Sequence, residues 1–72
     1  MNIEEQDIIK LSDDINYLVV KIVVIDNIKY YYLISIDQNK ITKFLYEKEN
    51  ELIEVTDKLI IQKIAFNIAK SM

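Results

Sequence analysis

The side chains best suited to chemistry in this chain are the carboxylates of Glu47, Glu49, Glu51 and Glu54, which follow one another closely. Converging oxygens of this kind can bind Ca²⁺ or Mg²⁺, and two carboxylates can act as the acid and base of a hydrolase. Their spacing does not match an EF-hand loop, and a hydrolase also needs a concave pocket. We therefore interpret the group as a solvated acidic turn, and we expect no metal and no cofactor.

Nucleophilic catalysis lacks its usual base, because the 72 residues include no His and no Cys. The hydroxyls of Ser and Thr therefore have no imidazole to accept their proton. Lys21 lies in the middle of an apolar run, and it is the lysine for which burial could lower the pKa enough for Schiff-base chemistry. A lysine that pairs with a carboxylate or reaches solvent is the simpler interpretation. We therefore predict that the protein is not an enzyme.

The tyrosines and lysines suggest a third kind of chemistry, the base stacking and charge pairing that hold single-stranded nucleic acids. The chain has five Tyr and nine Lys but no Arg, and its net charge is −3. Specific readout relies on Arg side chains that reach guanine, and non-specific binding needs a basic surface. We therefore do not expect the isolated protein to bind nucleic acid, although a weak single-strand binder stays as an alternative.

The central element of the predicted fold is a β-hairpin, because Tyr17–Ile25 and Ile28–Ile36 flank the two-residue turn Asp26–Asn27. Both runs are rich in β-branched and aromatic residues, which favour strands. Because the chain has no Gly, its turns must place Asp or Asn where φ is positive. Two further strands, separated by short turns, complete an antiparallel meander: residues 41–46 and 51–55.

Helices are predicted at both ends of the chain. Asn2, with Glu5 three positions later, has the form of a capping box for a short helix over residues 2–11. Thr56 or Asp57 would cap a longer helix over residues 58–71. The predicted fold is therefore α+β in a single domain of residues 1–72: a short N-terminal helix, a four-stranded antiparallel meander, and a C-terminal helix packed on one sheet face.

Alternation along the strands divides the sheet into two faces, in a register that pairs Val23 with Tyr30 and Val19 with Ile34. The cleaner apolar face, on which we expect the C-terminal helix, carries Leu18, Val20, Ile22, Val24, Tyr31, Leu33, Phe44, Tyr46, Ile53 and Val55. The opposite face holds Lys43 and Glu54 as an expected cross-strand ion pair, yet it is too apolar to be left in water. Its predicted contact residues for a partner are Tyr30, Tyr32, Ile34, Val19 and Val23.

The C-terminal helix adds a second apolar patch, because Leu59 and Phe66 lie seven residues apart and share one side of it. A helix that packs against one sheet needs only the stripe that contains Ile60, Ile64 and Ile68. Leu59 and Phe66 therefore either wrap around the edge of the core or belong to a protein interface.

Two segments resemble a family of short, acidic, uncharacterised bacterial proteins: Ile28–Ile36 (IKYYYLISI) and Glu51–Asp57 (ELIEVTD). The resemblance implies a β-meander with a Tyr-x-x-Leu strand, which Tyr30 and Leu33 match, and a closing helix after Asp57. The chain departs from that pattern at Asn27, where the family has Gly, and after Asp57, where the family has acidic residues. The resemblance implies a fold and no activity.

The apolar surplus, the missing catalytic side chains and the acidic balance indicate a small non-enzymatic regulatory or accessory protein. It would act through protein–protein binding, as a homodimer, with a larger protein partner, or both. An alternative is an accessory or inhibitory factor of a bacterial mobile element, such as a recombinase directionality factor, which would contact DNA together with its partner. We expect no membrane association, because the longest apolar run, Ile22–Ile25, is too short, and we expect a cytoplasmic location, because Cys is absent.

Overall fold

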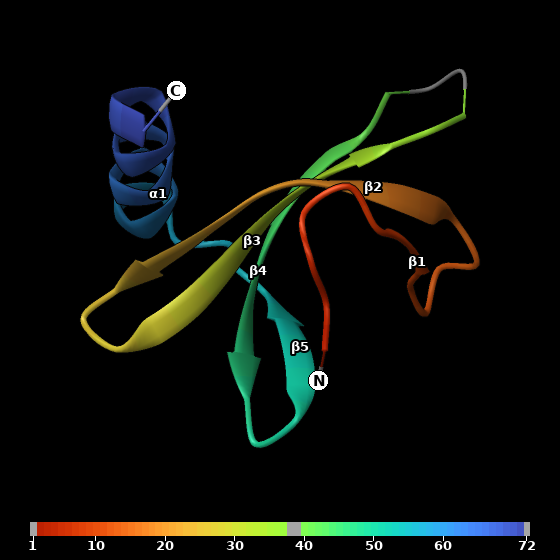
Figure 1. Ribbon diagram of the computed structural model, residues 1–72, viewed down its shortest axis with the longest axis horizontal. Coiled ribbons are helices and arrows are strands. Elements are labelled where there is room, and N and C mark those ends of the chain that lie inside the picture. Colours follow the sequence, from red (N-terminus) through yellow and green to blue (C-terminus); the bar gives the residue numbers. More distant parts are fainter. Residues whose placement is uncertain (1, 38–39, 72) are drawn as a thin grey trace.

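The computed structural model describes residues 2–37 and 40–71 and arranges them as a five-stranded antiparallel sheet with a C-terminal helix (Figure 1). The elements, in chain order, are β1 (Ile8–Lys10), β2 (Asn16–Ile25), β3 (Ile28–Ser35), β4 (Thr42–Lys48), β5 (Glu51–Glu54) and α1 (Lys58–Ser71). Each strand is hydrogen-bonded to the next one along the chain. The sheet curls into a half-barrel, and α1 lies against its outer face toward the β2–β3 turn (Figure 1).

The predicted N-terminal helix over residues 2–11 is wrong, and the fifth strand, β1, lies there instead. The carboxylate of Asp7 accepts a hydrogen bond of 2.9 Å from the Glu4 amide, which closes a tight turn before β1. Ile9 packs into the core while its neighbour Ile8 is 60% exposed, so the segment alternates as a strand does. A helix of this length is marginal on its own, whereas two successive isoleucines pair readily with the edge of β2.

The predicted hairpin turn is confirmed. Asp26 and Asn27 have φ angles of 53° and 66°, the left-handed values that a type I′ turn needs at both central positions. The turn between β4 and β5 follows the same plan, with Glu49 at 51° and Asn50 at 64°. Because the chain has no Gly, side chains with a Cβ occupy these strained positions.

A bulge between Val19 and Lys21 interrupts the pairing of β2 with β3. The predicted register is correct on the side of the bulge nearer the turn, where Val23 lies opposite Tyr30. On the other side it is wrong, because Val19 lies opposite Leu33 rather than Ile34. A bulge adds one residue to a strand and so reverses the faces of the β2 residues beyond it, whereas simple alternation counted from the turn does not.

The segment before β1 completes the edge of β2 at this bulge. The Gln6 amide donates to the Val19 carbonyl at 2.8 Å, and the Val19 amide donates to the Asp7 carbonyl at 2.8 Å. The carboxylate of Glu5 accepts a 3.0 Å hydrogen bond from the amide of Ile22. Backbone groups on the edge of β2 beyond the end of β1 are thus satisfied by the N-terminal segment.

The inside of the half-barrel holds one of two apolar cores. Its buried members are Tyr17, Val19, Tyr31, Leu33 and Leu45, with Ile3, Ile9, Leu11, Ile15, Ile22 and Leu52 packed around them. The second core lies between α1 and the outer face, and its buried members are Tyr30, Val55, Ile64 and Ile68. Each face of the sheet therefore contributes to a separate core.

The helix covers only part of the set of side chains predicted for it, including Phe44, Tyr46 and Val55. Tyr31 and Leu33, which were expected beneath the helix, are fully buried inside the half-barrel instead. Tyr32 lies opposite Phe44, so these two rings share a face, where they stack at a centroid distance of 5.1 Å beneath α1. The prediction assigned them to opposite faces, because the sequence does not reveal the register across the β3–β4 turn.

The predicted C-terminal helix is confirmed over Lys58–Ser71. Asp57 rather than Thr56 caps it, since the Asp57 carboxylate accepts a 2.9 Å hydrogen bond from the Leu59 amide. Among the residues that the structure describes, no helix is both long enough and apolar enough to cross a membrane.

Candidate protein-binding surface

The outer side of α1 exposes two large apolar side chains. Leu59 is 75% exposed and Phe66 is 66% exposed, whereas Ile64 and Ile68 are buried against the sheet. At about 100° per residue, the first pair points roughly 170° away from the second pair around the helix axis. Leu59 and Phe66 therefore do not wrap the edge of the core, and the helix is apolar on two opposite sides.

Lysines flank this pair. The ammonium of Lys70 lies 5.8 Å from the centroid of the Phe66 ring, and Lys63 lies 3.7 Å from the carboxylate of Asp26 in the β2–β3 turn. α1 contains three of the nine Lys and no Asp or Glu, so the rest of the chain has six Lys against twelve carboxylates. The helix thus carries a charge of +3 and the remainder a charge of −6.

A second exposed apolar surface lies on the outer face of the sheet; we name it the outer strip, made of Ile8, Leu18, Ile34 and Ile36. Ile8 lies opposite Leu18, which lies opposite Ile34, so these three side chains point to one face. Ile34 is two residues beyond Tyr32 and so shares the face on which α1 packs. Ile8 is 60% exposed and Ile36 is 48% exposed.

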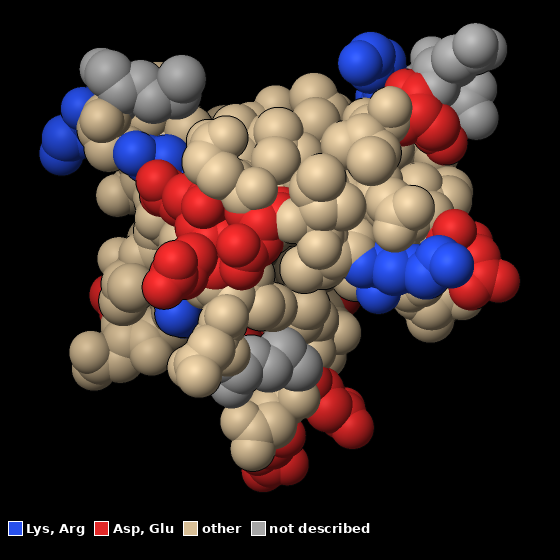
Figure 2. All heavy atoms as spheres, turned by 45° about the vertical axis from the view of Figure 1, so that its right-hand side comes forward, with Lys and Arg blue, Asp and Glu red and all other residues tan. Residues whose placement is uncertain are grey.

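The helix leaves the outer strip uncovered because it stands over the other end of the sheet. In Figure 1, α1 lies toward the β2–β3 turn, while β1 lies at the opposite end. Figure 2 shows that charged side chains form separate groups on one side of the molecule, around a broad uncharged area. α1 thus covers the part of the outer face near the β2–β3 turn and leaves Ile8 and Ile36 exposed at the other end.

The seven residues predicted as an interface are divided among different environments. Val19 is fully buried inside the half-barrel, and Tyr30, 8% exposed, is buried beneath α1. Val23 and Tyr32 are half-buried against the helix. The remaining three residues reach the surface: Leu59 and Phe66 are exposed on α1, and Ile34 is partly exposed in the outer strip.

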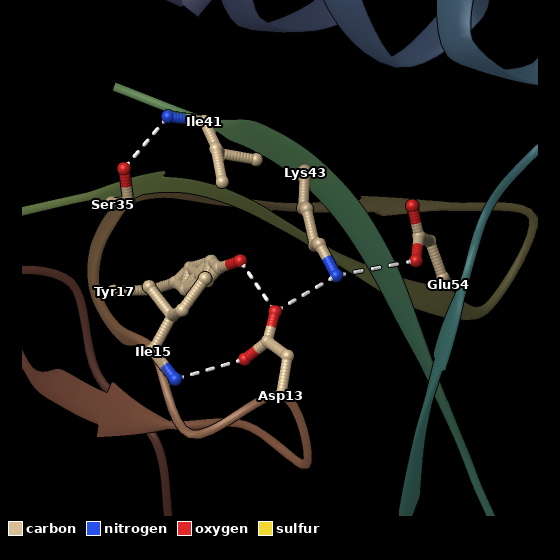
Figure 3. Close-up of polar contacts among 7 residues, drawn as sticks. All are labelled: Asp13, Ile15, Tyr17, Ser35, Ile41, Lys43 and Glu54. Carbon is tan, nitrogen blue, oxygen red and sulfur yellow. Dashed lines mark hydrogen bonds and ion pairs between the residues drawn. The ribbon is translucent and has the colours of Figure 1, made fainter. Parts of the chain in front are cut away.

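A polar network crosses the open mouth of the half-barrel, where the β1–β2 turn meets β4 and β5 (Figure 3). The carboxylate of Asp13 accepts hydrogen bonds from the Ile15 amide at 3.0 Å, the Tyr17 hydroxyl at 2.8 Å and the Lys43 ammonium at 3.2 Å. Lys43 also lies 3.5 Å from Glu54, which confirms the predicted ion pair. Glu54 is opposite Leu45, so this pair is diagonal rather than directly opposite.

The network moves the pKa values of its members in directions that keep it charged. The hydrogen bonds from the Ile15 amide and the Tyr17 hydroxyl lower the pKa of Asp13. The hydrogen bond to Asp13 raises the pKa of Lys43, while burial and the same carboxylate raise the pKa of Tyr17. Near neutral pH, Asp13 is therefore a carboxylate, Lys43 an ammonium and Tyr17 a neutral phenol.

A hollow of about 300 Å³ beside this network brings Ser12 and Lys43 to the same wall. A serine nucleophile would need a neutral lysine as its base, and a raised pKa is the opposite of that requirement. A second hollow, of about 380 Å³, lies at the start of α1 and has a mostly apolar wall that includes Tyr30, Tyr46 and Ile60. Asp57 lines this hollow at the start of the helix, but its carboxylate already caps α1.

The other side chains considered for chemistry also have structural partners. Lys21 lies 3.8 Å from Glu5, and its side chain is 27% exposed. Glu47 accepts a 2.6 Å hydrogen bond from the buried Tyr31 hydroxyl, which lowers the pKa of Glu47, while burial raises that of Tyr31. Within residues 2–37 and 40–71, no three His, Cys, Asp or Glu side chains converge as a metal site would require.

The sequence interpretation missed two parts of this surface. Ile8 and Ile36 were not proposed as contact residues; Ile8 was expected in the N-terminal helix, which the structure replaces by β1. No contact was predicted for Asp13, whose carboxylate accepts a 3.0 Å hydrogen bond from the Ile15 amide two residues later, the geometry of an Asx turn.

Comparisons with known proteins found no match for this chain among protein-family models, curated proteins or solved structures. The resemblance to short acidic bacterial proteins therefore stays a prediction, and the function has to be argued from the surface itself.

Proposed function

We propose that this protein is a small non-enzymatic regulatory or accessory protein that acts in the cytoplasm by binding protein. The observation that carries the proposal is the exposure of Leu59 (75%) and Phe66 (66%) on the side of α1 that faces away from its own sheet. Large apolar and aromatic side chains set among lysines, in contact with water, are typical of a binding surface.

The polar side chains support a binding role over catalysis. Asp13, Lys43 and Glu54 hold the two sides of the half-barrel mouth together, and Glu47 satisfies the buried Tyr31 hydroxyl. These polar groups hold the fold together, and a reaction that changed their charge would weaken it. The exposed apolar side chains of α1, Leu59 and Phe66, stabilise no contact of this kind.

The tyrosines support a protein partner over a single-stranded nucleic acid. A stacking platform needs ring faces open to solvent. Tyr17, Tyr30 and Tyr31 are buried, and Tyr32 and Tyr46 are half-buried in the core beneath α1. Two lysines lie 5.7 Å from a tyrosine ring: Lys29 lies over the buried Tyr31, and Lys43, over Tyr17, is already engaged by Asp13 and Glu54.

Site-specific photo-crosslinking tests the proposal. A photoreactive phenylalanine analogue replaces Phe66 in the full chain, expressed in the cells from which the protein comes. The same analogue replaces Val24 as a control, since Val24 is equally exposed (65%) but lies near the end of the β2–β3 hairpin.

We expect a discrete crosslinked product from position 66 and none from position 24, and the mass of the product identifies a second copy or another protein. Absence of any protein adduct at position 66, with the fold intact by circular dichroism, would refute the proposal.

A further inference from the structure

We propose that a second copy of this chain binds the exposed side of α1, with Leu59 and Phe66 of each copy packed on the outer strip of the other. This inference rests on the proposed function and names the partner. Each copy supplies one helix and one strip, so the contact is isologous and closes as a two-fold dimer.

The helix has the pattern of an element between two layers. A helix on the surface of a domain needs one apolar stripe, which in α1 contains the buried Ile64 and Ile68. Leu59 and Phe66 lie on the opposite side, one above the other at a spacing of about 10.5 Å along the axis. A second sheet placed on that side would give each helix an apolar layer above and below it.

The second apolar layer already exists on the molecule. The outer strip lies on the same face of the sheet as α1 and is not covered by it, with Ile8 60% and Ile36 48% exposed. When two copies meet face to face about a two-fold axis, the helix of each copy can lie over the open half of the other sheet. The result is a sheet, a layer of two helices, and a second sheet.

Charge favours this occupant over the others. α1 carries +3 and the rest of the chain −6, so the body of a second copy as a whole attracts the helix, although Lys10 shares the face of the outer strip with Ile8. Pairing of the two helices alone would bring the Lys63 and Lys70 rows of both copies together, which is repulsive. An anionic membrane would attract the helix but repel the acidic body. Two apolar side chains also contribute less free energy of membrane binding than one acyl chain does, and one acyl chain alone binds only marginally.

Sedimentation velocity of the full chain at micromolar concentration tests the dimer. The variants are Phe66→Glu on the helix, Ile36→Glu and Ile8→Lys on the outer strip, and Val24→Glu as an exposed apolar control outside both surfaces. We expect the wild type and Val24→Glu to sediment as dimers. We expect each of the other three to raise the dissociation constant by about thirtyfold or more, with unchanged circular dichroism.

Mixing distinguishes this contact from other dimers. For this test a further variant, Ile36→Lys, is mixed with Phe66→Glu, and each of the two disrupts one side of the contact. In a heterodimer, Glu at position 66 of one copy meets Lys at position 36 of the other, while the second contact is native on both sides. Mixing the two variants should therefore restore dimers. A wild type that is dimeric but insensitive to both outer-strip substitutions, or no restoration on mixing, would overturn the proposed contact.

A wild type that stays monomeric would also overturn it. In that case a Phe66 crosslink to a different protein would leave the proposed function standing, whereas binding to vesicles that contain phosphatidylserine would assign the helix to a lipid surface. Loss of every crosslink and of self-association together would refute the proposed function as well.

Discussion

The carboxylate of Asp13 lies 3.2 Å from the ammonium of Lys43, although thirty positions separate the two residues. Asp13 belongs to the β1–β2 turn and Lys43 to β4, so the contact ties together elements on the two sides of the half-barrel mouth (Figure 3). The same carboxylate orders its own turn through the amide of Ile15. One side chain therefore connects local turn geometry to the closure of the sheet.

This relationship predicts a loss of stability in acid. The pKa of Asp13 is lowered in the folded protein, chiefly by the hydrogen bond from the Ile15 amide. A carboxylate with a lowered folded pKa stabilises the fold fully above its unfolded pKa of about 3.9, and this contribution disappears as pH falls through the folded value. We expect the free energy of unfolding, measured by urea denaturation, to decrease below about pH 5 and to decrease less steeply in Asp13→Asn. Asp14→Asn should keep the wild-type slope; equal slopes in all three proteins would contradict the assignment.

The two sides of α1 should respond differently to truncation. Ile64 is fully buried, so Ile64→Ala should lower the free energy of unfolding by about 2–5 kcal/mol. Phe66 is 66% exposed, so in dilute solution Phe66→Ala should change it by less than about 0.5 kcal/mol. Chemical denaturation of both variants measures the difference. Equal losses would mean that Phe66 belongs to the core of the single chain.

The turn between β4 and β5 should be open to stabilisation. Glu49 has a φ angle of 51° and Asn50 of 64°, and a left-handed conformation costs a residue with an ordinary side chain about 1–2 kcal/mol. Replacing the pair by Asn-Gly, the preferred type I′ sequence, should raise the free energy of unfolding by about 1 kcal/mol. Thermal or urea denaturation tests this, and Lys48→Gln, at the last residue of β4, provides a neutral control. An unchanged or lower stability would argue against the turn conformation.

The N-terminal segment should protect one amide of β2 in particular. Glu5 accepts the hydrogen bond of the Ile22 amide at 3.0 Å, beside the bulge. Removing the acceptor in Glu5→Ala should speed hydrogen exchange of the Ile22 amide by about tenfold or more, as followed by NMR. Glu4→Ala alters a neighbouring carboxylate and should leave that amide unchanged. Equal protection in both variants would show that Glu5 is not the acceptor.

Local features of this chain could be predicted because they depend on neighbours in sequence. The Asp26–Asn27 turn needs left-handed residues between two β-branched runs, and the pairing of Val23 with Tyr30 follows from that turn by counting. The bounds of α1 follow from the cap at Asp57 and a helical apolar period up to Ser71. No long-range contact is needed to predict these features.

Other features depend on contacts between distant segments. The residues from Ile8 to Lys10 match a helix start as well as a strand, and the free edge of β2 decides between the two. The bulge at Val19 and the pairing of Tyr32 with Phe44 determine which side chains α1 covers, and a shift of one residue reverses a face without changing composition.

By itself, the sequence determined an antiparallel meander closed by an amphipathic helix, because turn chemistry and periodicity are properties of short segments. Only the tertiary structure decided that Tyr30 is core and that Phe66 and Ile36 are surface. The physical reason is that burial depends on which faces meet, and that choice is made by register across turns and bulges, where sequence periodicity carries no information.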